Sequence, residues 1–110
     1  MGMNSQTILV LITAPSEAVA SEIANVLLER KLAACVNFVT PVSSLYTWQG
    51  SIHNDREILM LVKSRLDIFA DRLVPAVRSL HPYETPEIIA LPVMAGFQGY
   101  LNWIEASTTA

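Results

Sequence analysis

Residues 33–64 read AACVNFVTPVSSLYTWQGSIHNDREILMLVKS, and their pattern predicts a long β-hairpin. β-Branched and aromatic residues are frequent in Ala33–Trp48, which predicts one strand, and Glu57–Ser64 predicts the strand that returns. The turn is predicted at Gln49–Gly50–Ser51. Pro41 interrupts the first strand. Because proline cannot donate a sheet hydrogen bond, we expect a bulge or a sheet edge there.

Segments on both sides of this hairpin complete the predicted set of helices and strands. In chain order they are a strand at Gln6–Thr13, a helix at 16–31, a helix at Leu66–Leu80, a strand at Pro86–Val93 and a short helix at Phe97–Ala106. Ser16 is the expected N-cap of the first helix. Pro75 lies inside the second helix, where it should remove a hydrogen bond and kink the helix.

The resulting order, β-α-β-β-α-β plus a terminal helix, predicts an α+β fold, the ferredoxin-like sandwich. We expect a four-stranded antiparallel sheet with both main helices on one face and a C-terminal helix. At 110 residues the chain has the length of one domain. We expect this domain over residues 7–107, with a flexible N-terminus at 1–6 and a tail at 108–110.

The strand predicted at 58–62, Ile-Leu-Met-Leu-Val, is apolar on both of its alternating faces, and residues 8–12 and 88–91 repeat this pattern. An antiparallel sheet with one face in water should instead alternate apolar and polar residues. Helices cover only one face of this fold, and the chain is 52% hydrophobic and 15% charged. We therefore expect an obligate homo-oligomer whose subunits bury the second face.

Composition argues against several classes of partner. The formal net charge is −3 and no basic run occurs, so we expect no nucleic-acid partner. The longest apolar stretch, Ile8–Ile12, is far too short to span a membrane. The N-terminus lacks the features of a signal peptide. Cys35 is the single cysteine, which permits no intrachain disulfide and indicates a cytoplasmic location.

His81 is the leading candidate for a metal ligand, because imidazole commonly binds copper and zinc. Glu84 is the second candidate, and Glu87 and the phenol of Tyr83 lie in the same short segment. The alternative is an exposed histidine at a helix end beside solvated acids. No His-x-x-His or Cys-x-x-Cys spacing occurs, so we expect Cu(II) or another divalent cation to bind weakly.

Cys35 and Lys63 form a second candidate site, a ligand cleft. The predicted turn places Lys63 opposite Val36 and diagonal to Cys35, where an ammonium group would favour a thiolate or bind an anion. One alternative is that Cys35 packs as a small hydrophobe. Another is that Lys63 forms a salt bridge with Glu84 or Glu87, within one subunit or across subunits.

Aromatic side chains point to a stacking surface in such a cleft. Trp48 lies near the predicted hairpin tip and Trp103 lies on the closing helix, and with Tyr83 and Glu87 they complete the candidate cleft residues. The alternative is packing at a subunit interface, where aromatic residues contribute strongly to contact energies.

Familiar catalytic motifs are missing from the sequence. No serine lies in a Gly-x-Ser-x-Gly elbow, and no glycine-rich phosphate loop occurs. We therefore expect a protein that is not an enzyme and has no organic cofactor.

Four segments carry a family resemblance. They are KLAACVN at 31–37, SLYTWQG at 44–50, HPYETPEI at 81–88 and GYLNW at 99–103. With them the chain resembles the CutA family of divalent-cation tolerance proteins from about Thr7 to Ser107. The resemblance implies a ferredoxin-like fold and a homotrimer similar to the trimers of PII signalling proteins. It also implies a cytoplasmic protein linked to tolerance of copper and other divalent cations.

The sequence departs from this family at its copper ligands. Some members carry a cysteine at the position of Ile12 and a histidine at the position of Leu80, and both are assigned as copper ligands beside the residue that matches His81. Only His81 is retained here. A metal would therefore bind His81 together with carboxylates, water or groups of another subunit.

Three functions follow from these observations. The first is a trimeric cytoplasmic protein that supports tolerance of divalent metal ions, copper above all, by binding them without catalysis. The alternative is a PII-like sensor that binds a small anion at clefts between subunits, near Lys63. A third hypothesis, a hydrolase or transferase that uses Cys35, has the least support because no partner for the thiol is evident in the sequence.

Overall fold

The computed structural model describes residues 6–108 of the chain. Its elements run in the order β1 (Thr7–Ala14), α1 (Glu17–Glu29), β2 (Cys35–Trp48), β3 (Ser51–Arg65), the 3₁₀-helix η1 (Leu66–Ile68), the π-helix η2 (Phe69–Leu73), α2 (Val74–Leu80), β4 (Ile88–Pro92) and α3 (Gln98–Ser107). Most of the predicted flexible N-terminus and tail, residues 1–5 and 109–110, lies outside the described residues.

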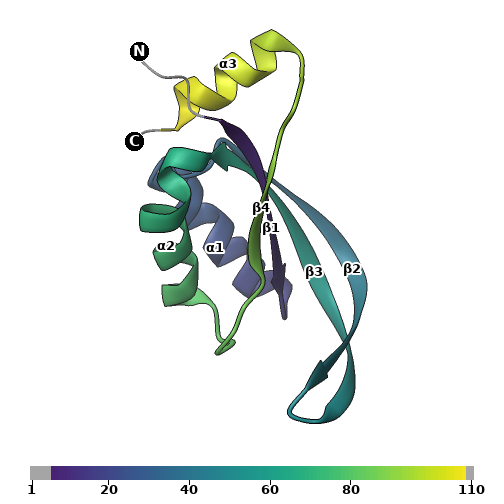
Figure 1. Cartoon of the computed structure of the whole chain (residues 1–110). Coiled ribbons are helices and arrows are strands. Elements are labelled where there is room, and N and C mark those ends of the chain that lie inside the picture. The colour runs from purple at the N-terminus through teal and green to yellow at the C-terminus, as the bar shows by residue number, and fades with distance from the viewer. Residues whose placement is uncertain (1–5, 109–110) are drawn as a thin grey trace.

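The strands form one four-stranded antiparallel sheet in the order β2-β3-β1-β4. Helices α1 and α2 lie on one face of this sheet, and α3 lies beyond the end at which β1 begins (Figure 1). The predicted α+β, ferredoxin-like arrangement with a C-terminal helix is confirmed. The β2–β3 hairpin projects beyond the sheet, and the molecule is accordingly elongated, 49 × 26 × 22 Å.

The hydrophobic core lies between the sheet and these two helices. Alternate residues of β1 and β3 are buried on this face, as the period of a strand requires. They meet the apolar stripe of α1, whose buried residues are Ala20, Ile23, Ala24 and Leu27. The predicted N-cap of α1 is confirmed, because Ser16 Oγ accepts a hydrogen bond of 3.2 Å from the Val19 N–H.

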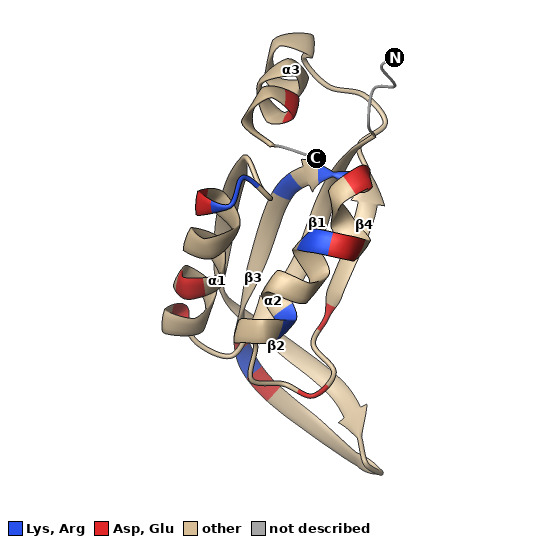
Figure 2. Cartoon of the chain, turned by 90° about the vertical axis from the view of Figure 1, so that its left-hand side faces the viewer, with Lys and Arg blue, Asp and Glu red and all other residues tan. Residues whose placement is uncertain are grey.

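The opposite face of the sheet, here called the open face, is also apolar. Leu11 pairs with Leu61 of β3 and with Ile89 of β4, and Leu9 pairs with Leu91 of β4. These side chains are half-buried or exposed in the single chain. The predicted apolar character of both faces is therefore confirmed. Charged residues occur along α1 and α2, and a smaller number lie on β3 (Figure 2).

The bulge predicted at Pro41 is confirmed. The pairing of β2 with β3 shifts register between Val39 and Val42, on either side of this proline. The extra residue moves the remaining pairs by one position, so Lys63 lies directly opposite Cys35. The prediction that Lys63 faces Val36 was wrong for this reason.

The strand β3 begins at Ser51, whereas the sequence predicted a strand only from Glu57. The polar residues before Glu57 carry no strand signal of their own. They form a strand because β2 pairs with them residue by residue up to the turn. Gln49 (φ 51°) and Gly50 (φ 82°) both adopt positive φ, as a two-residue hairpin turn that matches the strand twist requires. The other predicted boundaries agree with the structure to within two residues.

Pro75 is accommodated without breaking the helical path. The predicted helix at 66–80 is divided into η1, η2 and α2, and Pro75 lies in the first turn of α2. A proline there displaces no intrahelical hydrogen bond of the α-helix, because the first N–H groups have no partner within it. The predicted loss of a hydrogen bond inside a continuous α-helix was therefore wrong. The π-helical turn ends at Leu73, so a new α-helix begins just before the proline.

Two adjacent leucines of α1 test where the core lies. Leu27 is 0% exposed and Leu28 is 40% exposed. We expect Leu27→Ala to lower the free energy of unfolding by about 2–5 kcal/mol, because it leaves a cavity. Leu28→Ala should change it by about 0.5 kcal/mol or less. Denaturant unfolding at one fixed protein concentration measures both, and equal losses would contradict this assignment of the core.

Candidate functional site

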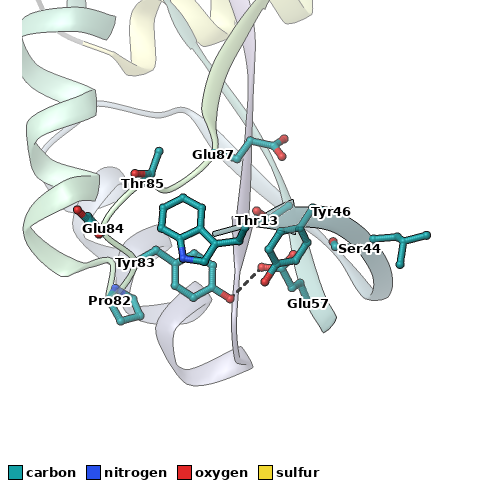
Figure 3. A pocket seen from close by; sticks show the side chains of 11 residues that line it. Thr13, Ser44, Tyr46, Glu57, Pro82, Tyr83, Glu84, Thr85 and Glu87 are labelled. Atoms are coloured by element: carbon teal, nitrogen blue, oxygen red, sulfur yellow. Dashed lines mark hydrogen bonds between the residues drawn. The ribbon is translucent and has the colours of Figure 1, made fainter. Parts of the chain in front are cut away.

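A cavity of about 690 Å³ lies between the projecting hairpin and the loop that follows α2. Its wall combines the end of β1, parts of β2 and β3 and the loop at 82–87 (Figure 3). The lining residues are Thr13, Ser44, Leu45, Tyr46, Trp48, Glu57, Pro82, Tyr83, Glu84, Thr85 and Glu87. We call this cavity the hairpin pocket.

His81 fixes the loop that forms one wall of this pocket. It is the C-cap of α2 and its backbone is extended, as expected for a residue that precedes proline. The His81 residue is only 7% exposed. Nε2 lies 2.8 Å from the Thr13 carbonyl oxygen, and Nδ1 accepts a hydrogen bond of 3.2 Å from the Tyr83 N–H. Because Nδ1 accepts, Nε2 carries the proton and donates it to Thr13.

This geometry bears on both interpretations of His81, as an exposed histidine and as a metal ligand. The interpretation of His81 as an exposed histidine was wrong, because the imidazole is buried between β1 and the loop. Both ring nitrogens are engaged in hydrogen bonds, so a metal can reach one only by displacing a partner. Within residues 6–108, no group of three His, Cys, Asp or Glu side chains is placed to hold a metal ion.

Glu57 is the buried charge of the pocket. The residue is 5% exposed, and its Oε2 accepts a hydrogen bond of 3.0 Å from the Tyr83 hydroxyl (Figure 3). Burial, and after it the hydrogen bond to Glu57, raise the pKa of Tyr83 to about 12. The phenol therefore stays protonated and keeps donating to Glu57 at neutral pH.

Tyr46 is held in a similar way on the hairpin wall. Its hydroxyl donates to Asp55 Oδ2, and this hydrogen bond is the main reason that the pKa of Tyr46 is raised. The ring of Tyr46 stacks on His53, with 5.5 Å between centroids and 19° between planes. Contacts on both sides thus orient this ring where it lines the pocket.

The second candidate site, at Cys35 and Lys63, lies at the other end of the sheet. Lys63 Nζ donates to Asn37 Oδ1, so the salt bridge considered with Glu84 or Glu87 is not formed within residues 6–108. Burial and then the neighbouring Cys35 thiol raise the pKa of Tyr100.

Tyr100 belongs to α3 and stacks on Trp103, with 5.6 Å between ring centroids. Lys63, Cys35 and the Tyr100–Trp103 pair therefore form a cluster of their own near α3.

Within one chain, the structure separates the predicted residues into two groups. Trp48, Tyr83, Glu84 and Glu87 share the hairpin pocket. Cys35, Lys63 and Trp103 belong to the cluster near α3. Lys63 lies six positions along β3 from Glu57 of the pocket, about 20 Å at roughly 3.3 Å per residue.

Sequence reasoning missed Glu57 and the Thr13 carbonyl. Glu57 was treated only as the first residue of a strand. Its signal is that it continues the side of β3 that is occupied by Leu59 and Leu61, so a charge lies in an otherwise apolar row. The Thr13 carbonyl has no signal in the sequence, because any residue type supplies the same backbone oxygen.

Comparison with known proteins shows which family has this sequence and architecture. The family model of the CutA1 divalent ion tolerance protein matches residues 8–107. The chain belongs to the CutA1 family. The divalent-cation tolerance protein CutA of Thermus thermophilus is 50% identical over 99 residues, which are 90% of this chain and 95% of that protein. Protein CutA of Mus musculus is 46% identical over 88% of this chain, which spans 54% of the length of the mouse protein.

Solved CutA1 structures share the fold. The structure of the Thermus thermophilus protein superposes with a TM-score of 0.90 at 48% identity, covering 94% of this chain and 99% of that one. The CutA of Archaeoglobus fulgidus, described as periplasmic, superposes with a TM-score of 0.88 at 42% identity, covering 92% and 97%. Among the helices that lie within residues 6–108 of this CutA1-family protein, none is long and apolar enough to cross a membrane.

The Tyr83–Glu57 contact makes a prediction about alkaline pH. Because the folded pKa of Tyr83 is about 12 and the ordinary value is 10.0, its contribution to stability is complete below pH 10 and is lost as pH rises from 10 to about 12. Tyr83→Phe should remove part of the decline in unfolding free energy over this range.

The measurement is denaturant unfolding across the alkaline range, with Tyr46→Phe as the matched control. Tyr46 makes its hydroxyl contact in a more exposed setting, so its substitution should change the decline less. An equally steep decline in Tyr83→Phe and the unaltered protein would contradict the assignment.

Proposed function

We propose that this CutA1-family protein supports tolerance of divalent cations by binding them as a cytoplasmic homotrimer, without catalysis. The observation that carries the proposal is the charge of the hairpin pocket. Its charged lining residues, Glu57, Glu84 and Glu87, are all carboxylates. Such a lining attracts cations and repels anions. The family's link to divalent-ion tolerance agrees with this charge.

The proposed metal ligands are His81 and Glu84, with water or groups from another subunit completing the coordination. Imidazole and carboxylate together suit Cu(II) and other divalent metals. The positions that carry copper ligands in some relatives hold Ile12 and Leu80 here, and both contact the apolar core. Since His81 must also give up a hydrogen bond to bind a metal, the affinity should be weak.

The open face supports the proposed homotrimer. Its leucines from β1, β3 and β4, with Ile89 of β4, form an apolar surface on a sheet whose other face is already buried. Surfaces of this kind are typically covered by a partner. A cytoplasmic location is supported by the single cysteine, which remains a free thiol.

A second function, the binding of a small anion at clefts between subunits, is favoured by one observation. The Lys63 ammonium donates to the neutral amide of Asn37, and no carboxylate in residues 6–108 forms an ion pair with it. Its charge is therefore available to an anion in an assembled cleft, with Cys35 directly opposite on β2.

Calorimetric titration of the metal-free protein with Cu(II) tests the first function. We expect saturable binding that weakens at least tenfold in His81→Ala, about 1.4 kcal/mol, and also weakens in Glu84→Gln. Glu22→Gln is the control, because Glu22 lies on the exposed surface of α1, away from the pocket lining. Binding that is the same in all variants would overturn the ligand assignment and leave anion binding as the better function.

Charge substitution on the open face tests the homotrimer. Leu61→Asp would place an unpaired carboxylate in the proposed interface, so we expect it to prevent assembly. Leu28→Asp, on the exposed surface of α1, should leave assembly unchanged. Sedimentation or light scattering measures both, and a Leu61→Asp protein that keeps the size of the unaltered oligomer would show that this face is not the interface.

A further inference from the structure

The two ring nitrogens of His81 are not equally available to a metal ion. Nε2 carries the ring proton and donates it to the Thr13 carbonyl at 2.8 Å, whereas Nδ1 holds the lone pair that accepts the Tyr83 N–H at 3.2 Å. A cation can bind Nδ1 without removing a proton from the ring. At Nε2 it would have to replace the proton and also displace the carbonyl of a central strand. Nδ1 is therefore the favoured ligand atom.

The contact of Nε2 with Thr13 is the support that a metal-binding imidazole needs. A histidine ligand commonly donates its other ring N–H to a carboxylate or a backbone carbonyl, which fixes the tautomer and the orientation of the ring. Thr13 is paired with Leu59 of β3, so the sheet holds this acceptor in place. The acceptor need not move when a cation arrives at Nδ1.

The group that occupies Nδ1 belongs to the loop at 82–87. The Tyr83 N–H and a metal ion need the same lone pair, so they cannot bind Nδ1 together. Tyr83 fastens the loop a second time, because its hydroxyl donates to Glu57 Oε2 at 3.0 Å. A shift of the Tyr83 backbone away from His81 moves its ring as well. The closed position of the loop, with both contacts made, therefore competes with a cation at His81.

We infer that cation binding at His81 Nδ1 and the closed position of the loop at 82–87 exclude each other, so a bound cation opens the loop. The coupling rests on the proposed function, since it requires His81 to bind the cation. Such coupling is reciprocal, so a change that weakens the closed loop tightens cation binding. Tyr83 is thereby a positioning residue, which lowers the cation affinity without binding the cation itself.

Calorimetric titration of Tyr83→Phe with Cu(II) tests the coupling. The substitution keeps the backbone N–H and the ring, and it removes only the hydroxyl that holds the closed loop to Glu57. Because less free energy then opposes opening, we expect Cu(II) to bind about threefold more tightly than it binds the unaltered protein. Tyr46→Phe is the matched control. Its hydroxyl donates to Asp55 within the hairpin, so its loss should leave the affinity unchanged.

Amide hydrogen exchange measures the opening without any substitution. The Tyr83 amide proton bonds to Nδ1 in the metal-free protein. We expect it to exchange about tenfold faster when the protein is saturated with Zn(II), a diamagnetic probe. The amide of Val10, which is buried in the central strand β1, is the internal control and should not exchange faster. A ligand that binds the folded state ordinarily stabilises it and slows exchange, so faster exchange at this loop amide is specific to the coupling.

The outcomes separate the coupling from the proposed function. Cu(II) binding that is unchanged or weaker in Tyr83→Phe, or no faster exchange of the Tyr83 amide, would overturn the coupling, while weaker binding in His81→Ala would still support the ligand assignment. Binding that His81→Ala leaves unaffected would overturn both. Circular dichroism and oligomer size identify a variant that fails to fold. In that case Glu57→Gln, which weakens the same hydrogen bond from its acceptor, replaces Tyr83→Phe.

Discussion

The pairing of β1 with β3 is the constraint on which the rest of the molecule depends. These two central strands carry apolar side chains on both faces, and a single layer of helices can bury only one of them. The buried face sets the positions of α1 and α2. The open face leaves Leu11, Leu61 and their neighbours uncovered in the single chain. One run of alternating residues therefore specifies the tertiary core and, on its other side, an apolar surface that the core does not use.

His81 connects the sheet to the hairpin pocket through hydrogen bonds. Its imidazole joins the end of β1, through the Thr13 carbonyl, to the loop that carries Tyr83. Tyr83 in turn reaches across to Glu57 of β3. Backbone and side chain thus alternate in a chain of hydrogen bonds from the centre of the sheet to the pocket wall. A residue that was considered for its affinity to metals has, in the folded chain, a demonstrable role in positioning this loop.

Much of the fold could be predicted from the sequence because its signals are local. Ser16 caps α1, Pro41 marks the bulge, and the two-faced strands indicate the open face. The early part of β3 was missed because its pairing comes from β2 and not from its own composition. Lys63 was misplaced by one residue because the length of a bulge depends on tertiary structure. The interpretation of Pro75 failed because a π-helical turn has no recognisable sequence pattern.

The candidate site was less predictable than the fold, since it is assembled from distant segments. The loop residues Tyr83, Glu84 and Glu87 were identified together because they are neighbours in the sequence. Their association with Glu57 depends on how a helix end meets a strand, which no spacing reveals. Trp48 and Trp103 were predicted in one candidate cleft, but within one chain Trp48 lines the hairpin pocket and Trp103 lies on α3.

The projecting hairpin gives the pocket two walls of unequal stiffness. The loop wall is clamped to the sheet through a buried imidazole, whereas the opposite wall belongs to a two-stranded ribbon that leaves the sheet and has no helix behind it (Figure 1). An isolated ribbon resists bending far less than a sheet packed on a core. The wall that carries Tyr46 and Trp48 is therefore the softer of the two.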